Sequence, residues 1–438
     1  MLDDTHDPAV TSWVESANAP GADFPVQNLP FGWFRRRGDT PSAAKAAPPH
    51  PEIGVAIGDR ILPLAACGSS PASMNELMAE PADAQRRRRL ALHRLLRADA
   101  GPATRARLAA QLVPMAEAEL LVPAAIGDYT DFFSSIHHAT NASSLVRPGQ
   151  PLFPNYRHLP LAYHGRSSSI VASGTDIRRP AGQQRRLRQG FGAQGREGGP
   201  IYALTRRLDY EAELGLFVGP GNAMGNPIPI DQAWEHLFGV CLLNDWSARD
   251  IQAWEADPLG PFLSKSFATS VSPWVVTAAA LEPFRAAAAP RGAGDPPLVD
   301  NLSSPGDRAT GALRIEVEVW LATAAMRRDG VAPVRLSSSD AAALYWTPAQ
   351  LVAHHTSNGC NLRPGDLLGS GTLSGPVRES WGCLLELTRG GRELLSLPNG
   401  ETRGFLEDGD EVTLRGRCTA PGARSIGFGD CRGRVRAA

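Results

Sequence analysis

Glycine and proline punctuate this chain throughout and limit how far any regular element can run. Glycine supplies 44 and proline 37 of its 438 residues, together about 18% of the chain where average usage is roughly 12%. This high content of glycine and proline favours short strands, turns and irregular loops over a helical bundle. We therefore expect a mainly β fold with some α-helix. The length exceeds that of a usual single domain, which predicts two domains, and the segment L-L-V-P-A-A-I-G-D-Y-T-D-F-F marks the entry to the second, so their bounds are residues 1–122 and 123–438.

The N-terminal region combines an irregular start with a hairpin and helical patterns. Residues 1–50 are rich in proline, alanine, glycine and arginine, which predicts loose structure. Residues 54–64 predict a β-hairpin, because Gly58-Asp59 lies between two β-branched runs and suits a tight turn. Helical patterns extend from about Asn75 to Glu119, with a break expected at Gly101-Pro102.

Strand patterns dominate the larger region. Residues 313–321 carry apolar side chains at every odd position, as is typical of a half-buried strand. A helix is expected between the N-cap Thr347 and the stop signal Asn358-Gly359. The segment 282–311 is predicted to form an irregular loop, or surface excursion, on the outside of the domain. Further strands are expected at 208–218, 236–244, 273–278, 383–389, 392–397 and 411–416, the fourth and fifth joined through Gly390-Gly391.

Charge and apolar patterning exclude several classes of protein. The formal net charge is -1, so the chain lacks the excess of positive charge that is typical of nucleic-acid-binding proteins. The first residues, M-L-D-D-T-H-D, lack the apolar core of a secretory signal, and no apolar stretch approaches the ~18 to 20 residues of a membrane span. The cysteines show no C-x-x-C pair, which argues against a zinc ribbon or a disulfide scaffold. We therefore expect a cytoplasmic protein that binds neither nucleic acid nor membranes.

Four carboxylates occur at positions where burial makes them costly. Glu211 and Glu213 lie two residues apart in a predicted strand, so their side chains project to one face. Asp131 lies in D-Y-T-D-F-F, and Asp245 ends the apolar run L-F-G-V-C-L-L-N-D, where active-site side chains often emerge. Like charges in a buried site need a cation, and an all-oxygen set suits Ca²⁺, Mg²⁺ or Mn²⁺. The alternative is an acidic pair that decorates a solvated strand face.

Basic and amide side chains follow these acids in the sequence. The run W-S-A-R-D-I-Q-A-W can begin a helix, which would place Asp245, Arg249 and Gln252 on one face. Lys45 and Lys265 are the only lysines among the 44 basic residues, so Lys265 in P-F-L-S-K-S-F indicates a need for a compact ammonium. The alternatives are that Arg249 forms a surface ion pair with a neighbouring aspartate and that Lys265 is retained by chance.

Several long motifs in a fixed order carry a family resemblance. The chain closely resembles the fumarylacetoacetase family in D-Y-T-D-F-F-S-S-I-H-H-A-T-N, L-P-L-A-Y-H-G-R-S-S-S-I, L-D-Y-E-A-E-L, N-D-W-S-A-R-D-I-Q-A-W-E, P-L-G-P-F-L-S-K-S-F-A-T, N-G-C-N-L-R-P-G-D-L-L-G-S-G-T-L-S-G and E-S-W-G-C-L-L-E-L. The resemblance is strong over about residues 120–438 and weaker before. It implies an N-terminal SH3-like β domain with a helical segment, followed by a large mixed β-roll, and it implies a homodimer.

The resemblance also implies catalytic roles. His138 would be the general base, oriented by Glu386, and His137 is the competing candidate by sequence alone. The ligands of a catalytic divalent ion, Ca²⁺ or Mg²⁺, would be Asp131, Glu211, Glu213 and Asp245. The oxyanion-stabilising cluster would be Arg249, Gln252 and Lys265.

Positions for a second ion and for the substrate follow in the same way. A structural Mg²⁺ site would lie near Asp245, Lys265 and Thr269. Arg147, Tyr163, Gln252 and Thr372 match substrate-contacting positions. Phe133 and Ala256 stand where better-known members carry tyrosine, and the missing phenols remove two hydrogen-bond donors.

The activity implied is hydrolysis of the carbon–carbon bond of fumarylacetoacetate, a small molecule, to fumarate and acetoacetate in tyrosine and phenylalanine degradation. Such cleavage requires a carbanion to leave as an enolate, which a divalent ion stabilises, and a base to activate water. A related dioxo-acid isomerase, decarboxylase or hydratase is one alternative. A non-catalytic, metal-stabilised scaffold is another.

Overall fold

The structure is a computed structural model that describes residues 2–37, 50–68, 70–145, 147, 149–185 and 199–438. Lys45 and the end of the segment predicted to be loose therefore lie outside the described residues. Residues 2–37 are more regular than predicted, because Val14, Phe24 and Val26 are buried and β1 (Phe31–Arg36) enters a sheet. Apolar side chains spaced among the prolines account for this order.

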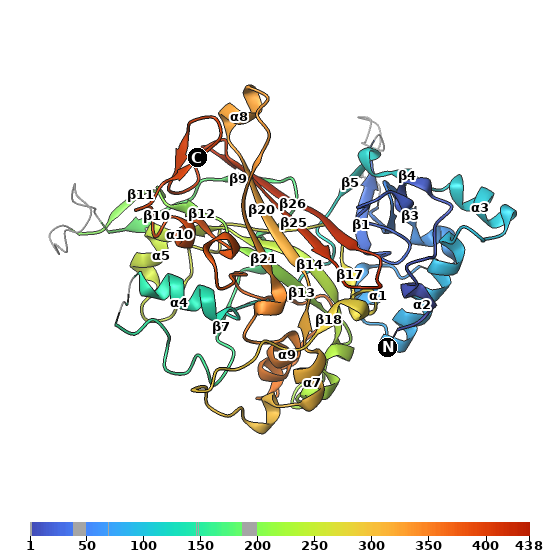
Figure 1. Cartoon of the computed structure of the whole chain (residues 1–438), viewed down its shortest axis with the longest axis horizontal. Helices are drawn as coiled ribbons and strands as arrows, with labels where there is room; N and C mark the ends of the chain where they lie inside the picture. The colour runs from blue at the N-terminus through green and yellow to red at the C-terminus, as the bar shows by residue number, and fades with distance from the viewer. Residues whose placement is uncertain (1, 38–49, 69, 146, 148, 186–198) are drawn as a thin grey trace.

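The N-terminal domain, at the right in Figure 1, contains an antiparallel sheet with strand order β4-β3-β2-β1-β5. The predicted hairpin is confirmed: β2 and β3 pair on either side of Gly58-Asp59, where Gly58 has φ of 57°. Val55 and Leu62 of this hairpin pack in one cluster with Leu92 and Leu96 of α2. The strands are β1, β2 (Glu52–Ile57), β3 (Arg60–Pro63), β4 (Val113–Pro114) and β5 (Ala118–Leu120).

The helical part of this domain is shorter than predicted. It comprises α1 (Met74–Met78), α2 (Ala82–Leu96) and α3 (Pro102–Ala109). The break at Gly101-Pro102 is confirmed, because Gly101 caps α3 and Pro102 is its first residue. The prediction of helix as far as Glu119 is wrong, since the residues after α3 return to the sheet as its two edge strands.

Two large sheets, accompanied by two-stranded ones, form the centre of the C-terminal domain. The larger has strand order β7-β6-β22-β13-β14-β16-β8, with β17 also paired to β14, and the smaller has order β21-β20-β25-β26-β9. The two sheets pack against each other through β14, β25 and β26 (Figure 1). The strands of the larger sheet are β6 (Tyr129–Phe132), β7 (Ala162–His164), β8 (Ile170–Ala172), β13 (Ala212–Val218), β14 (Leu237–Asp245), β16 (Thr269–Val271), β17 (Val276–Thr277) and β22 (Leu367–Gly369). The strands of the smaller sheet are β9 (Asp176–Arg178), β20 (Glu316–Ala322), β21 (Val334–Asp340), β25 (Glu411–Cys418) and β26 (Ile426–Arg436).

Most strand predictions for this domain are confirmed with adjusted ends. The alternating segment 313–321 becomes β19 (Ala312–Leu313) and β20, and its odd-numbered residues are buried. Strands also form within 236–244 and 411–416. Segment 208–218 divides into β12 (Leu208–Asp209) and β13, and 273–278 retains only β17.

The hairpin predicted through Gly390-Gly391 is wrong. Residues Leu384–Leu387 form helix α10, and β23 (Leu395–Ser396) pairs instead with β24 (Thr402–Arg403). A short apolar run does not by itself distinguish a strand from a buried helix. Here the first two backbone N–H groups of α10 donate to the carboxylate of Asp209, which favours the helix.

The remaining helices of the C-terminal domain surround the sheets. The predicted helix is confirmed as α9 (Pro348–Thr356), with Thr347 as its N-cap. The segment 282–311 is only in part a surface excursion, because Phe284 and Leu302 are buried in the core. No helix among the described residues combines the length and apolarity that crossing a membrane requires. The others are α4 (Ile136–Ser144), α5 (Arg249–Glu255), α6 (Ala278–Leu281), α7 (Pro305–Thr310) and α8 (Ala324–Arg328).

Candidate active site

Four buried carboxylates converge at one edge of the larger sheet. Asp131 comes from β6, Glu213 from β13 and Asp245 from the end of β14, and Glu211 lies just before β13. Each offers an oxygen atom within 4.8 Å of the others. Neighbouring strands bring these residues together, since β13 pairs directly with β14 and β22 lies between β13 and β6. The predicted convergence of these acids is confirmed.

Half of this acidic cluster is neutralised by the protein itself. The Lys265 ammonium donates to Glu211 and, over 2.9 Å, to Asp245 Oδ2. Burial opposes ionisation of Glu211, but Lys265 and Arg249 together hold its pKa well below the usual range. Thr269 and Tyr163 donate to the two oxygens of Asp245 over 2.9 Å and 2.8 Å.

The other half, Asp131 and Glu213, forms no ion pair with a basic side chain among the described residues, although Glu213 Oε2 accepts the backbone N–H of Gly371 over 3.1 Å. Burial first, and then the neighbouring acids, raise the pKa of both carboxyls well above their ordinary values. Asp131 Oδ1 and Glu213 Oε1 are buried and have no hydrogen-bond partner among the described residues. Orphaned, closely spaced carboxylate oxygens need a cation, so these residues fit a hard divalent ion. Gly369 leaves the required space, since a Cβ there would lie 2.6 Å from Asp131 Oδ1.

A buried histidine–glutamate pair lies beside the acids. His138 Nδ1 is 2.7 Å from Glu386 Oε2, and its Nε2 is 3.9 Å from Glu211 Oε1. The first turn of α4 is fixed by Ser135, whose hydroxyl accepts the backbone N–H of His138. Burial would raise the pKa of Glu386, but His138 and the hydrogen bonds to the carboxylate lower it. The structure thus places His138, rather than the half-buried His137, against Glu386.

Arg249 and Gln252 meet on α5, but Asp245 does not share that helix. The segment Ser247–Ala248 forms β15, which pairs with β12, so the chain stays extended until Arg249. The helical face predicted for all three residues is therefore wrong at Asp245. Arg249 Nη1 donates to Glu211 Oε1 over 2.7 Å and to Gln252 Oε1 over 3.1 Å. Arg249 Nη2 is buried without a partner in the described part of the chain.

The structure brings only some of the predicted substrate-contacting residues to the site. The ring of Phe133 lies edge-on to His138 with 5.3 Å between centroids. Thr372 is buried, and Ala256 follows α5 in a half-buried position. The Arg147 guanidinium lies 4.5 Å from the ring centroid of Phe153, and no hydrogen bond or ion pair joins it to the described side chains of the site.

Four further polar residues support the site and are absent from the sequence prediction. Asn141 and Ser374 donate to Glu386 over 2.8 Å and 2.7 Å. Asp209 accepts from Arg249 Nε over 2.9 Å, and the buried Tyr129 hydroxyl lies 3.2 Å from where a Cβ of Gly369 would be. Strand alternation signals two of them, since Asp209 shares parity with Glu211 and Tyr129 with Asp131. Asn141 and Ser374 carry no comparable signal.

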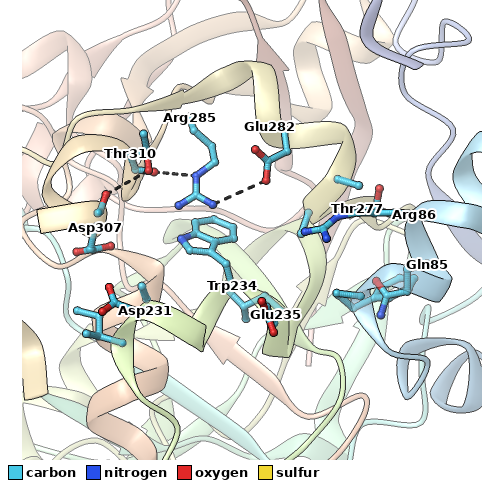
Figure 2. Close-up of a pocket in the computed structure, with 18 of the residues that line it drawn as sticks. Gln85, Arg86, Asp231, Trp234, Glu235, Thr277, Glu282, Arg285, Asp307 and Thr310 are labelled. Carbon is cyan, nitrogen blue, oxygen red and sulfur yellow. Dashed lines mark hydrogen bonds and ion pairs between the residues drawn. The ribbon is translucent and has the colours of Figure 1, made fainter. Parts of the chain in front are cut away.

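A separate cavity of about 260 Å³ lies between α2 and the C-terminal domain. Figure 2 shows the Arg285 guanidinium stacked on the Trp234 ring within it, and these groups are 4.1 Å apart. None of the predicted site residues lines this cavity. The candidate active site is therefore the carboxylate cluster and its neighbours on α4, α5 and α10. Figure 1 shows these three helices on the side of the C-terminal domain away from the N-terminal one.

Comparisons with known proteins show the family of the chain. Residues 129–436 match the profile described as fumarylacetoacetate (FAA) hydrolase C-terminal, and residues 27–123 match fumarylacetoacetase N-terminal. The chain is 45% identical over 436 residues to a fumarylacetoacetase of Oryza sativa subsp. japonica, covering 95% of each chain. It is 44% identical over 436 residues to the Homo sapiens fumarylacetoacetase, covering 95% of this chain and 97% of that one.

The fold is also found in a solved structure. A fumarylacetoacetate hydrolase from psychrophilic Exiguobacterium antarcticum is 16% identical and superposes with a TM-score of 0.50, covering 93% of this chain and 100% of that one. That likeness concerns the fold, whereas the profiles and the full-length relatives concern the sequence. On these grounds the chain is a member of the fumarylacetoacetase family.

Proposed function

We propose that this protein hydrolyses the carbon–carbon bond of 4-fumarylacetoacetate to fumarate and acetoacetate, the last step of tyrosine and phenylalanine degradation. The observation that carries the proposal is the buried His138–Glu386 pair beside a cluster of four buried carboxylates, in which Asp131 Oδ1 and Glu213 Oε1 have no hydrogen-bond partner among the described residues. The relatives named fumarylacetoacetase support the choice of substrate.

Asp131, Glu211, Glu213 and Asp245 would hold a divalent ion, Ca²⁺ or Mg²⁺. When bound, such an ion supplies Lewis-acid polarisation of the substrate's carbonyl oxygens. The protein prepares the site by keeping Glu211 ionised through Lys265 and Arg249. Lys265 and Thr269 both bind Asp245, and we assign a second, structural Mg²⁺ to their vicinity.

His138 acts as the general base in this proposal. An ionised Glu386 only accepts hydrogen bonds, so Nδ1 of His138 carries the proton and Nε2 presents a lone pair to water. Nε2 takes a proton from the attacking water, and Glu386 then stabilises the imidazolium. Such a base typically contributes about 10²- to 10⁴-fold to the rate.

Arg249, Gln252 and Lys265 receive the charge that develops on the attacked carbonyl. Arg249 Nη2 is a buried donor with no hydrogen-bond partner among the described residues, and an oxyanion would supply the missing acceptor. Tyr163 and Thr372 would contact the substrate, as would Arg147 after leaving Phe153. Phe133 and Ala256 present no hydroxyl there and would contribute only apolar contact.

The test is turnover of fumarylacetoacetate by the purified protein with added Mg²⁺ or Ca²⁺, followed by ultraviolet absorbance and by NMR identification of the products. We expect fumarate and acetoacetate in equal amounts. An isomerised, decarboxylated or hydrated product would instead support the related dioxo-acid enzymes. His138→Ala should lower kcat by about 10²- to 10⁴-fold with the fold intact, while His137→Ala should leave it near the wild-type value. If His138→Ala left turnover unchanged, the assignment of His138 as the general base would be wrong.

We also assign the protein to the cytoplasm as a homodimer. All six cysteines are free thiols, and four are buried, which suits a reducing compartment. An exposed apolar surface runs over α5, the loop that follows it and β11 (Ile201–Leu204), and it would be covered by a second copy. We call this the α5 surface, and it consists of Tyr202, Leu204, Trp254, Leu259, Phe262 and Leu263.

A further inference from the structure

Asp209 is a fully buried carboxylate that joins the two halves of the active site. It ends β12, which pairs with β15 so that Asp209 lies opposite Ser247. Arg249 follows β15 directly as the first residue of α5. This pairing brings Arg249 Nε within 2.9 Å of Asp209 Oδ2.

The same carboxylate also holds the start of α10. Its Oδ1 accepts the backbone N–H of Leu384 over 2.8 Å, and its Oδ2 accepts that of Leu385 over 2.9 Å. Cys383, the N-cap residue of α10, makes no side-chain cap within the described residues. Asp209 therefore performs the N-cap function for this helix from 175 residues away in the chain.

Both partners of Asp209 carry groups used in the proposed mechanism. Glu386 is the third residue of α10, and its carboxylate binds His138 Nδ1. Arg249 uses Nε on Asp209 and Nη1 on Glu211, which leaves Nη2 as the donor without a described partner. Any movement of Asp209 would therefore shift the base and the oxyanion donor relative to each other.

We propose that Asp209 is a positioning residue that fixes the guanidinium of Arg249 and the first turn of α10 together. It thereby sets the distance between the oxyanion donor and the His138–Glu386 pair. This inference rests on the roles proposed above for Arg249 and Glu386.

Asp209→Asn is the most direct test, because it keeps the shape and removes the charge. The Asp209 carboxylate accepts from Arg249 Nε and from the backbone N–H groups of Tyr210, Leu384 and Leu385. An amide also carries N–H groups, so at least one of these four donors would face another donor. We expect kcat to fall by about 10- to 100-fold, as for small misplacements of catalytic groups, and KM for fumarylacetoacetate to change less than about threefold.

Asp410→Asn is the matched control. Asp410 is also fully buried, and it accepts two hydrogen bonds from Arg403 and one from the backbone N–H of Glu407. It makes no described contact with the active site, so its variant should lose stability but keep kcat near the wild-type value.

Double variants separate positioning from general weakening. In the Arg249→Gln and Glu386→Gln backgrounds, Asp209→Asn should lower kcat by a smaller factor than in the wild type, because each background has already lost one of the groups that Asp209 positions. If Arg249→Gln and Glu386→Gln themselves leave kcat unchanged, the proposed site is wrong. If they lower kcat and the folded Asp209→Asn protein stays within twofold of wild type, only the positioning role is wrong.

A folding failure would also be informative. Asp209→Glu keeps the charge but lengthens the side chain, and it should lower kcat like Asp209→Asn if the latter does not fold. If neither Asp209 variant folds while Asp410→Asn does, Asp209 serves the scaffold alone and the positioning role is refuted.

Discussion

At the scale of single residues, the acidic cluster is asymmetric. Glu211 and Asp245 are satisfied by Lys265 and by neighbouring donors, whereas Asp131 and Glu213 keep buried oxygens without described partners. The protein has therefore used its own cations on one side of the cluster only. The unsatisfied side is where affinity for a divalent ion should originate.

Gly369→Ala should damage metal binding more than folding. The new Cβ would lie 2.6 Å from Asp131 Oδ1 and 3.1 Å from Glu213 Oε2, both at the unsatisfied side of the cluster. Overpacking of this kind costs about 1–3 kcal/mol. Because the strain lies where the ion would bind, we expect Ca²⁺ or Mg²⁺ to raise the melting temperature of the variant less than that of the wild type. Scanning calorimetry with and without the ion measures this. Gly294→Ala, whose Cβ would meet nothing within 4 Å, is the control, and equal metal responses in both variants would contradict the prediction.

At the scale of elements, short helices are stabilised at their ends by distant residues. Thr347 caps α9 through Gln350 and also donates to the buried carboxylate of Asp307 over 2.9 Å. Helix α10 depends on Asp209 in a similar way. These elements therefore owe their stability to tertiary contacts as much as to local sequence.

Thr347→Ala should lower the free energy of unfolding by about 1–2 kcal/mol, through the lost N-cap and the unpaired Asp307. Denaturant titration measures this loss. Thr347→Ser keeps the hydroxyl and should recover most of the stability. Failure of serine to do so would show that the methyl group, rather than the cap, is responsible.

Helix α2 carries a histidine that should make folding sensitive to acid. Burial, and then the charges of Arg89 and Arg97, lower the pKa of His93 from 6.5 to about 4. Between these values the unfolded chain binds a proton that the folded chain does not, so stability is full above about pH 6.5 and falls as the pH decreases towards 4. His93→Leu should remove this contribution, as seen in melting temperatures measured at several pH values. His158→Leu, at an exposed position, should leave the pH dependence unchanged.

The elements also show how far sequence reasoning reaches. The alternation from 313 to 321 and the cap at Thr347 are local signals, and both predictions are confirmed. The strand predicted at 383–389 is wrong, because the helix there depends on Asp209, which no local pattern near Leu384 reveals. Likewise, the sequence predicts that Glu211 and Glu213 share a cation, but not that Lys265 already neutralises the first of them.

At the scale of the whole molecule, the α5 surface adjoins the active site. Leu259 is 92% exposed and Phe262 67% exposed, and both lie in the loop that runs from the end of α5 towards Lys265. Large exposed apolar groups of this kind mark interfaces. A partner that covers this loop would also restrict movement around the catalytic groups.

Leu259→Asp combined with Phe262→Asp should therefore weaken dimerisation. Loss of central apolar contacts costs about 2 kcal/mol or more, and light scattering after gel filtration should show a shift from dimer to monomer on dilution. Met224→Asp changes an 80% exposed residue away from the α5 surface and should have no effect. A double variant that remains as dimeric as the wild type would place the interface elsewhere.

The scarcity of lysine has a practical consequence. Lys265 is 6% exposed and bound to two carboxylates, and Lys45 is the only other lysine in the chain. Reagents directed at side-chain amines, whether fluorophores, cross-linkers or resins, should therefore leave Lys265 unmodified and spare the carboxylate cluster that it binds. Such tethering would keep an immobilised preparation active, whereas chemistry aimed at guanidinium groups would modify it at many sites.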